Sequence, residues 1–415
     1  MSWRTTSGRA WPIQRRPGLA LALAALALAP VAVFASAGTV LVVAITGAVL
    51  AFGLPELRAA LRALSSPLSL ALIAFLVWAA LSAVWAPDPG GSFVLTLRCG
   101  LLFAAGLICV SSAAGLQPTE RRRAAIGIAL GGALMLLLLV VETASNAALT
   151  RFIRDMNMAE LMERTDGVPL ARGGTLFAVL CWPALLAAAR LSGGRAAALL
   201  FLPIPALLYL QPITASVVAI GAGAAAFALV YAWPRPMLRL LFGLLLVSLA
   251  ATPLLPPVLA ATAPLEQGIE YLPLSWQHRV EIWLFAADKI AERPLLGWGF
   301  DATRSLGAIQ SHVVSGSTLA LHPHNFSLQL WLELGGVGVV IAGWLGVLLF
   351  QYLLRLADDR AAVATAAAAL TCYLVYGQLS RGAWQNWWLA AAWLLAAALA
   401  VVMPFRRDAA AVQSR

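Results

Sequence analysis

Long apolar segments limit what this chain can fold into more than any other feature of its sequence. Twelve of them are long enough, or nearly so, to cross the hydrocarbon core of a bilayer as helices. The chain is 61% hydrophobic and 11% charged, with a mean hydropathy of +0.86, and this is too little charge for a soluble protein of 415 residues. The second, seventh and eleventh segments are short for a span. We expect an all-α integral membrane protein with helices near 18–35, 38–54, 67–86, 94–115, 124–142, 174–191, 196–212, 214–232, 237–258, 326–354, 361–377 and 386–404.

The distribution of arginine predicts how the chain is oriented in the membrane. The net charge is +10, and every basic residue except Lys289 is an arginine. Most arginines lie in short gaps between apolar segments, and alternate gaps, starting with the N-terminal one, carry far more than the gaps between them. The positive-inside rule therefore predicts that both termini lie in the cytoplasm. Membrane orientation explains the charge, and no nucleic-acid partner is expected.

The first apolar segment has a second interpretation. Basic residues, an apolar run and Ala35-Ser36-Ala37 together resemble a signal peptide with its cleavage site. The apolar run is long for a signal peptide, so we expect a retained helix. Cleavage would leave the orientation of the later segments unchanged.

Two long loops are expected on the outer side of the membrane. The smaller spans about 143–173 and the larger about 259–325. All four histidines fall in the larger loop, namely His278, His312, His322 and His324. Histidine is the side chain that most often moves protons near neutral pH. The larger loop is therefore expected to carry the active site.

The larger loop contains a segment with the pattern of an amphipathic helix, SWQHRVEIWLFAADKIAER, which should end before Pro294. Two faces are expected, an apolar one of Trp276, Val280, Trp283, Ala287 and Ile290 and a polar one of Gln277, Glu281, Asp288 and Glu292. Arg279 falls at the edge of the apolar face. It either reaches toward a lipid headgroup or a surface carboxylate, or points beneath the helix at an anionic ligand such as phosphate.

The stretch LHPHNFSLQLWLELGGVG, residues 321–338, is polar at the point where a membrane helix begins. Asn325, Gln329 and Glu333 recur every four residues and so share one helix face, while Pro323 suits the first turn. The positive end of the helix dipole would favour phosphate and disfavour a protonated His324. His324 would then be neutral and could accept a proton, with the polar stripe orienting it from below.

Two other interpretations of these histidines remain open. His324 can be a capping or structural residue, which is the commoner role of a single histidine. His322 and His324 can also bind zinc, although the sequence offers no third ligand at a convincing spacing. We expect no metal, with His322 in a supporting role.

Two further arginines are expected at the outer face. Arg172 starts the sixth apolar segment on that side, where the helix dipole and the positive-inside bias both oppose a cation. Arg381 lies in GQLSRGAWQNWW between two glutamines. With Arg279 and His324, these residues suggest a phosphorylated donor and a hydroxyl to be deprotonated, although Arg172 can also reach toward lipid headgroups.

These residues resemble those of the O-antigen ligases, within the superfamily of O-antigen polymerases and ligases. One pattern is similar to the signature at the end of that family's large periplasmic loop. It consists of His324-Asn325, then nine residues, Gly335, two further residues and Gly338. HRVEIWLFAADKIAERPLLGWGFD is similar to the family's upstream segment, an Arg and a Trp followed by Pro and Gly-x-Gly. The twelve-span layout resembles the family over nearly the whole chain, and the motifs over about 255–340 plus Arg172. QPITAS lacks the Arg that relatives often carry after this Ser.

The resemblance implies an inverting, metal-independent glycosyltransferase with a GT-C-like fold in the bacterial inner membrane. It would transfer O-antigen polysaccharide from undecaprenyl diphosphate to a sugar hydroxyl of lipid A–core. His324 would be the base, Arg172 and Arg279 would bind the diphosphate, and no cofactor would be needed. Two alternatives stay open, an O-antigen polymerase with a second lipid-linked glycan as acceptor and a transporter of lipid-linked sugar. A single dominant outer loop disfavours the polymerase, and polar residues gathered at the outer face disfavour transport.

Overall fold

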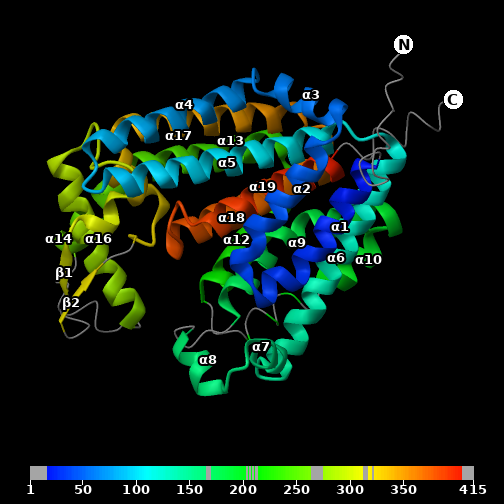
Figure 1. The fold of residues 1–415 in the computed structure, drawn as a ribbon, viewed down its shortest axis with the longest axis horizontal. Helices are drawn as coiled ribbons and strands as arrows, with labels where there is room; N and C mark the ends of the chain where they lie inside the picture. Colours follow the sequence, from blue (N-terminus) through cyan, green and yellow to red (C-terminus); the bar gives the residue numbers. More distant parts are fainter. Residues whose placement is uncertain are drawn as a thin grey trace, which may run out of the picture. The chain divides into compact units, whose positions relative to one another are not determined.

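The computed structural model describes residues 16–164, 170–201, 204, 207, 210, 214–262, 274–311, 316–319 and 322–403. Within these ranges nine helices are long and apolar enough to cross a membrane, which confirms an all-α integral membrane protein. Proline occupies the first turn of several of them, where its missing N–H costs no helical hydrogen bond. The nine (Figure 1) contain α1 Pro17–Phe34, α4 Pro67–Ser82 with η3 Ala83–Trp85, α5 Pro89–Ala114, α6 Pro118–Ala144, α9 Ala171–Ser192, α12 Thr214–Ala232, α13 Pro234–Ala251 with η4 Thr252–Leu254, α17 Phe326–Arg355 and α18 Arg360–Leu379.

Three of the twelve expected spans take a different form. The segment at 38–54 forms η2 Ser36–Gly38 and α2 Thr39–Ala51, and the chain then bends by 113° into α3 Leu54–Ala63. The segment at 196–212 begins as α10 Gly194–Phe201, and most of its remainder lies outside the described residues. The last segment forms α19 Asn386–Val402, which is apolar but only 17 residues long. The eleventh segment, by contrast, forms a helix of full spanning length, α18.

The bend between α2 and α3 has a cause in the sequence. Gly53 and Pro55 interrupt the apolar helix. The helix that follows carries Glu56, Arg58 and Arg62. A helix with these charges is more stable at the polar interface than in hydrocarbon, so the chain turns instead of continuing as one span.

The helices pack as two compact units, the first of which comprises residues 1–63, 103–211 and 393–415. Within it α1 packs against α6, and α9 packs against α6 and α10 (Figure 1). Two glycines allow α1 and α6 to approach closely, since a Cβ at Gly127 would lie 2.4 Å from Cα of Ala22 and one at Gly131 would lie 2.3 Å from O of Ala25. Two short helices, α7 Ala148–Arg154 and α8 Met158–Arg164, lie in the smaller expected loop.

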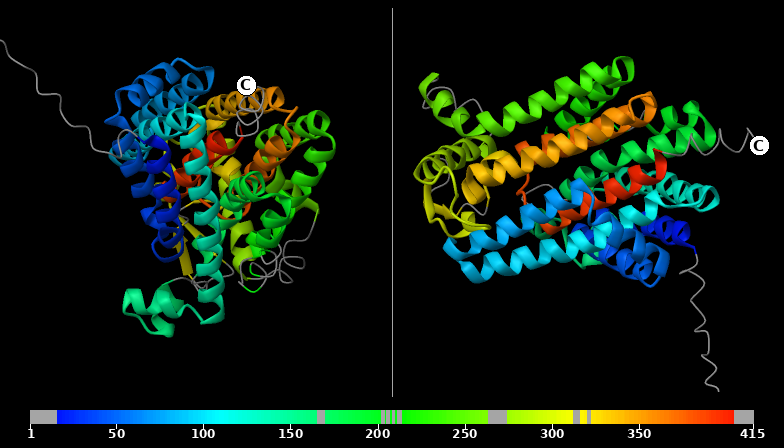
Figure 2. Two further views of the ribbon diagram at one scale, coloured as in Figure 1. Left: turned by 90° about the vertical axis from the view of Figure 1, so that its right-hand side faces the viewer. Right: turned by 90° about the horizontal axis from the view of Figure 1, so that it is seen from above.

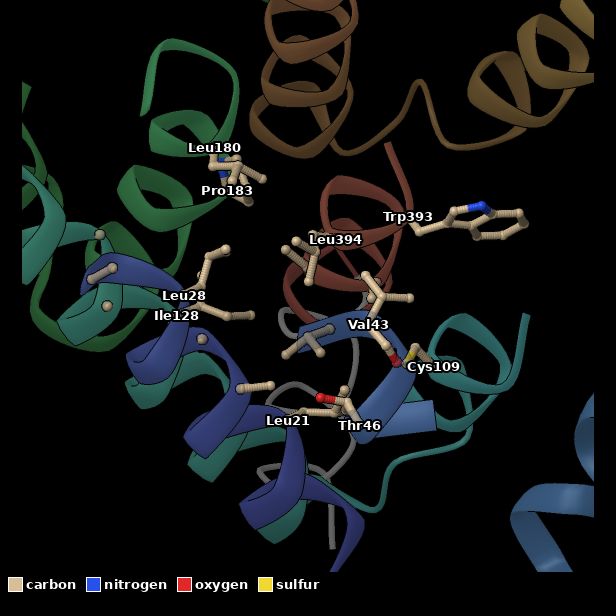
Figure 3. Close-up of a pocket in the computed structure, with 18 of the residues that line it drawn as sticks. Leu21, Leu28, Val43, Thr46, Cys109, Ile128, Leu180, Pro183, Trp393 and Leu394 are labelled. Carbon is tan, nitrogen blue, oxygen red and sulfur yellow. Dashed lines mark hydrogen bonds between the residues drawn. The ribbon is translucent and has the colours of Figure 1, made fainter. Parts of the chain in front are cut away.

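A small apolar cavity of about 70 Å³ lies inside this first unit (Figure 3). Leu21 and Leu28 of α1, Val43 of α2 and Leu394 of α19 contribute to its lining. Its lining contains no charged side chain. The cavity therefore offers no group that could bind a phosphate.

The second unit comprises residues 64–102 and 212–392. Its longest helix is α17, which packs against α4 and α13 and lies between them in the right-hand view of Figure 2. On another side of this unit, α12 packs against α18. The larger loop belongs to this unit and is ordered as α14 Leu255–Thr262, α16 Leu274–Glu292, η5 Ala302–Ser305, β1 Ala308–Ser311 and β2 Gly316–Leu319.

The two strands form an antiparallel hairpin in which Ala308 pairs with Leu319 and Ser311 with Gly316. The sequence did not lead us to expect strands in this loop, where only amphipathic helices were predicted. Each strand has four residues, and an alternating pattern of that length is too short to be distinguished from an irregular loop. His312, one of the four histidines, lies outside the described residues.

α17 is interrupted at Gly335, where the backbone adopts φ 62° and ψ −168°. This conformation is open to glycine and strongly unfavourable for residues that carry a Cβ. Space gives a second reason for glycine, because a Cβ here would lie 2.3 Å from the carbonyl oxygen of Leu295. The first Gly of the signature at the end of the loop is therefore required by the break in the helix.

The Gly-x-Gly of the upstream motif fills this break. The N–H of Trp298 donates to O of Leu332 at 2.9 Å, and the N–H of Gly299 donates to O of Glu333 at 2.8 Å. Those carbonyls would otherwise lack their helical partners in the apolar interior. The two motifs are thus joined by backbone hydrogen bonds, and the larger loop is anchored to α17 next to the polar stripe.

Candidate functional site

The turn before α17 carries the two histidines of the HPHN stretch. Asn325 is the N-cap, and its Oδ1 accepts a hydrogen bond from the N–H of Leu328 at 2.9 Å. The helix begins at Phe326, so the expectation that Pro323 lies in the first turn is wrong. The carboxamide of Asn325 satisfies a first-turn donor, and proline has no group that could do so. His324 adopts a left-handed φ of 53°, which turns the chain into the helix.

The position of this turn is fixed by α16. Nε1 of Trp283 donates to the carbonyl oxygen of Pro323 at 2.8 Å. The expected amphipathic helix is present and ends before Pro294, with Ala286 buried where Ala287 was expected. The apolar face of α16 packs on α17 in one buried cluster, to which α16 contributes Trp283, Ala286 and Ile290 and α17 contributes Leu328 and Leu332.

His324 is oriented by the segment that follows α18. Its Nδ1 lies 3.1 Å from the carbonyl oxygen of Ser380. A carbonyl can only accept, so Nδ1 carries the hydrogen and Nε2 keeps its lone pair. Burial lowers the pKa of His324 from 6.5 to about 4, the charges of Arg279 and Arg381 also lower it, and the Ser380 hydrogen bond opposes them. At neutral pH His324 is therefore an uncharged proton acceptor.

His322 packs edge-on against His324, with ring centroids 4.2 Å apart. Its Nδ1 accepts from the N–H of His324 at 3.3 Å. Its Nε2 then carries the hydrogen and lies 3.0 Å from Nε2 of Gln385; because an amide nitrogen cannot accept and Oε1 of Gln385 has no partner, the carboxamide is assigned the flipped orientation, in which its oxygen accepts. Burial lowers the pKa of His322 to about 3, helped by repulsion from His324 when that residue is protonated and from Arg304 and Arg381. Both ring nitrogens of His322 are engaged, which makes it less available as a base than His324.

Glu333 is the centre of the polar stripe and is fully buried. Its Oε2 accepts from the N–H of Asp301 at 2.9 Å and from Nε1 of Trp384 at 2.5 Å. Its Oε1 accepts from Oγ1 of Thr303 at 2.6 Å and from Nε2 of Gln329 at 3.0 Å. Donors on both oxygens explain how a carboxylate is accommodated within a membrane helix. Through this residue α17 binds both the η5 region and the segment after α18.

Two glutamines hold the end of α18 and the segment that follows it against α17. Oε1 of Gln329 accepts from the N–H of Ala383 at 2.8 Å. Nε2 of Gln378 donates to Oγ of Ser327 at 2.6 Å. These contacts lie on either side of Ser380 in sequence, so they fix the carbonyl that orients His324. The polar stripe thus acts on the histidine through its hydrogen-bond partner.

Two of the three candidate arginines belong to the same unit as His324. Arg279 is partly buried on α16, and its guanidinium carbon lies 5.1 Å from the ring centroid of Trp276. The guanidinium carbon of Arg381 lies 5.2 Å from the ring centroid of Trp387. Burial also lowers the pKa of Arg279. Both cations act on the pKa of His324, so the histidine stands in a positive environment that favours an anionic ligand.

Arg172 belongs to the first unit, whereas His324, Arg279 and Arg381 belong to the second. It lies in the first turn of α9, and its side chain is exposed. The adjacent Gly173 packs closely, since a Cβ there would lie 3.3 Å from O of Ala32. Arg172 is therefore placed where the sequence indicated, at the start of a spanning helix.

A cavity of about 470 Å³ lies beside His322, within the size range of small-molecule sites. The sequence did not single out Arg98, Asp301, Arg304 or Trp384, although all four line it. Arg98 carried a signal, since it is a charge inside an apolar segment. The lining comprises Gly90, Gly91, Val94, Leu95, Arg98, Asp301, Arg304, His322, Gln329, Gly382, Trp384, Gln385 and Asn386.

Comparison with known proteins agrees with the resemblance that these residues carry. Residues 196–343 match the family described as O-antigen ligase. A Rickettsia conorii protein named "Putative polysaccharide ligase" is 28% identical over 341 residues, which cover 80% of this chain and 79% of the relative. Proteins of the same description from Rickettsia felis and Rickettsia prowazekii are 27% and 28% identical over 342 residues, covering 80% of this chain and 79% and 80% of the relatives.

The matched segment contains α16, the two neighbouring histidines and the part of the broken helix α17 that holds the polar stripe. The candidate proton acceptor His324 and the candidate anion-binding residue Arg279 therefore both lie within the matched residues. The function is of the O-antigen ligase or polymerase type, carried out by a multi-pass membrane protein. On these grounds the chain is similar to the O-antigen ligase family, whose model matches residues 196–343, and to relatives named as putative polysaccharide ligases.

Proposed function

We propose that this protein is an O-antigen ligase that transfers O-antigen polysaccharide from undecaprenyl diphosphate to a sugar hydroxyl of lipid A–core. The transfer is inverting and uses no metal or other cofactor. The observation that carries the proposal is the state of His324, whose Nδ1 is engaged by the carbonyl of Ser380 at 3.1 Å while Nε2 keeps its lone pair. A neutral imidazole in this state is suited to take the proton of a sugar hydroxyl.

In the proposed reaction the acceptor oxygen attacks the anomeric carbon of the donor sugar while Nε2 of His324 takes its proton. The bond from the anomeric carbon to the diphosphate oxygen breaks, and its electron pair leaves with undecaprenyl diphosphate. Attack from the face opposite the leaving group inverts the anomeric configuration. The low pKa of His324, about 4, favours release of the proton to solvent after transfer.

The arginines neutralise the charge that develops on the diphosphate. Arg279 and Arg381 lie close enough to His324 to lower its pKa, which supports a donor site beside the base. A lipid diphosphate is already a good leaving group, and guanidinium groups bind phosphate oxygens bidentately. We assign Arg279 and Arg172 to the diphosphate and Arg381 to a donor or acceptor contact, with the role of Arg172 resting on the family resemblance.

The proposed topology follows from the arginine distribution. Both termini lie in the cytoplasm, the loops at 143–173 and 259–325 lie in the periplasm, and the first segment is retained. The whole chain, 1–415, acts as one polytopic domain of the inner membrane, surrounded by lipid, with its active site on the larger loop. The proton acceptor then faces the compartment in which both lipid-linked substrates are available.

Purified protein in lipid nanodiscs tests the proposal. Supplied with undecaprenyl-diphosphate-linked O-antigen and lipid A–core, it should form the joined glycolipid, and EDTA should leave the rate unchanged. Within the described residues no three His, Cys, Asp or Glu side chains are arranged to hold a metal, and the EDTA arm tests the zinc interpretation directly. Elongation of the lipid-linked glycan without transfer to lipid A–core would support a polymerase instead. Movement of the donor across the bilayer with no new glycosidic bond would support a transporter.

A further inference from the structure

The cavity beside His322 has walls from separate parts of the second unit. The start of α5, the η5 region and the segment at 382–386 all contribute, together with His322 and Gln329. Gly90 and Gly91 line it without side chains, so the cavity reaches the backbone of the first turn of α5. That turn is the positive end of a helix dipole. The carboxylate of Asp88 already accepts a hydrogen bond from the N–H of Gly91 at 3.0 Å, so the positive charge of the cavity has to come from side chains.

Arg98 adds a full positive charge to this wall. It lies within α5, a helix apolar enough to span a membrane, where an arginine is costly and marks a functional position by default. Across the described residues Arg98 makes no hydrogen bond or ion pair with another side chain or backbone group, and it lines the cavity. Its guanidinium is thus available to a ligand inside the cavity.

Arg304 supplies a second cation, and its neighbours supply neutral hydrogen-bonding groups. Nε of Arg304 lies 3.0 Å from Oδ1 of Asp301, which uses one of the five donors of the guanidinium. The carboxamides of Gln385 and Asn386 also line the space. Asp301 also lines the cavity and offsets one of the two positive charges. The remaining positive charge beside neutral amides suits a ligand that has both an anionic group and hydroxyls.

We propose that this cavity binds an acidic sugar of the acceptor, a saccharide unit bearing a carboxylate or a phosphate, with Arg98 and Arg304 contacting the anionic group. The inference rests on the proposed function and names the acceptor chemistry that function requires. The unit bound here is not the reacting sugar. It anchors the acceptor so that a neighbouring hydroxyl reaches the base.

We assign the cavity to the acceptor and not to the donor because the arginines form two groups, one that acts on His324 and one that lines the cavity beside His322. Arg279 acts on His324 and is not part of the described lining of the cavity. Arg304 acts on His322, and both Arg304 and His322 line the cavity. With the diphosphate assigned to Arg279, the space beside His322 is left for the second substrate, which must approach the same histidine pair from another direction.

Steady-state kinetics of Arg98→Gln in nanodiscs test the inference. Three forms of lipid A–core serve as acceptor, namely untreated, stripped of phosphate, and with carboxylates reduced to alcohols. For the untreated acceptor, KM should rise by on the order of tenfold, as expected for loss of one charge-assisted hydrogen bond, while kcat changes little. With the form that lacks the recognised charge, variant and wild type should have the same KM, and this identifies the group. Arg239→Gln, an exposed arginine of α13 outside the cavity, is the matched control.

A second variant narrows the cavity without removing charge. A Cβ at Gly90 meets nothing closer than 3.7 Å, so Gly90→Leu can be accommodated by the fold while its side chain occupies the space. KM for all three acceptors should then rise, with donor binding unchanged. If Arg98→Gln and Gly90→Leu both keep the wild-type KM for every acceptor, the cavity does not bind the acceptor. If the wild type transfers glycan to none of the acceptors, the proposed function itself is contradicted.

Discussion

The Nδ1 of His324 lies 3.1 Å from the carbonyl oxygen of Ser380, and this contact joins the entrance of α17 to the segment that follows α18. The two residues are 56 positions apart in sequence. Because a backbone carbonyl cannot change its role as acceptor, the tautomer of His324 is fixed before any substrate binds. Preorganisation of this kind lowers the cost of placing a base against a hydroxyl.

The pH dependence of transfer should report this histidine. A base must be uncharged to act, and burial lowers the pKa of His324 to about 4. kcat/KM should therefore stay constant as pH falls from neutrality and drop only toward pH 4, not near the ordinary 6.5. The bound diphosphate adds negative charge, which favours the imidazolium and should place the acidic limb of kcat at a higher pH than that of kcat/KM. Initial rates between pH 4 and pH 8 measure both, and a limb at 6.5 in kcat/KM would contradict the environment described for His324.

Replacing Arg279 should show whether its side chain binds the donor diphosphate or only reaches toward lipid headgroups. If it binds the diphosphate, Arg279→Ala should lower turnover by roughly 10²–10³, as for removal of a group that stabilises developing charge. Arg279→Lys should recover little, since a single ammonium cannot reproduce a bidentate guanidinium. Arg239→Ala, at an exposed position on α13, is the control. Near wild-type turnover for Arg279→Ala would assign the side chain to lipid headgroups instead. For Arg172→Ala we expect the same loss of turnover as for Arg279→Ala.

Glu333→Gln should destabilise the site more than it changes the chemistry. The carboxylate accepts from Asp301, Thr303, Trp384 and Gln329, and an amide nitrogen in place of one oxygen would face donors it cannot pair with. A loss of about 1–3 kcal/mol in stability is expected, with partial loss of activity because Trp384 and Ala383 lie close to the segment that orients His324. Thermal unfolding in detergent measures the loss, with the exposed Glu292→Gln as control. Equal unfolding temperatures for the two variants would show that the network contributes little.

The orientation of the loop can be tested at Ser311, in β1. In a chain whose four native cysteines are replaced, Ser311→Cys should react with a membrane-impermeant thiol reagent added outside the inner membrane. A cysteine at Arg122, exposed at the start of α6, should react only after the membrane is opened. The reverse pattern would invert the proposed topology.

The membrane helices and the face of the loop helix could be predicted because their signals are local. Apolar length identifies a span, and a repeat of three or four residues identifies the face that packs, as Trp283 and Ile290 illustrate. The same periodicity indicated that Gln329 and Glu333 share a face. It could not indicate what that face binds.

The partners of the polar stripe could not be predicted because they come from distant parts of the chain. Asp301 lies 32 positions and Trp384 lies 51 positions from Glu333, and nothing in a single sequence pairs such residues. Arg98 is visible as a single charge inside an apolar segment, but the sequence does not show that it faces a cavity, because the other walls come from distant residues. The break at Gly335 was visible as a glycine, but its cause is the inserted segment that contains Trp298.

The most direct test of the central claim compares wild type with His324→Ala in two measurements on one nanodisc preparation. Turnover with lipid-diphosphate-linked O-antigen and lipid A–core should fall by about 10²–10⁴, the contribution typical of a general base. Binding of the lipid-linked donor should be retained, because Arg279 and Arg381 remain, and His322→Ala should lose less activity. Full turnover by His324→Ala, or activity that EDTA abolishes and zinc restores, would show that His324 is not the base.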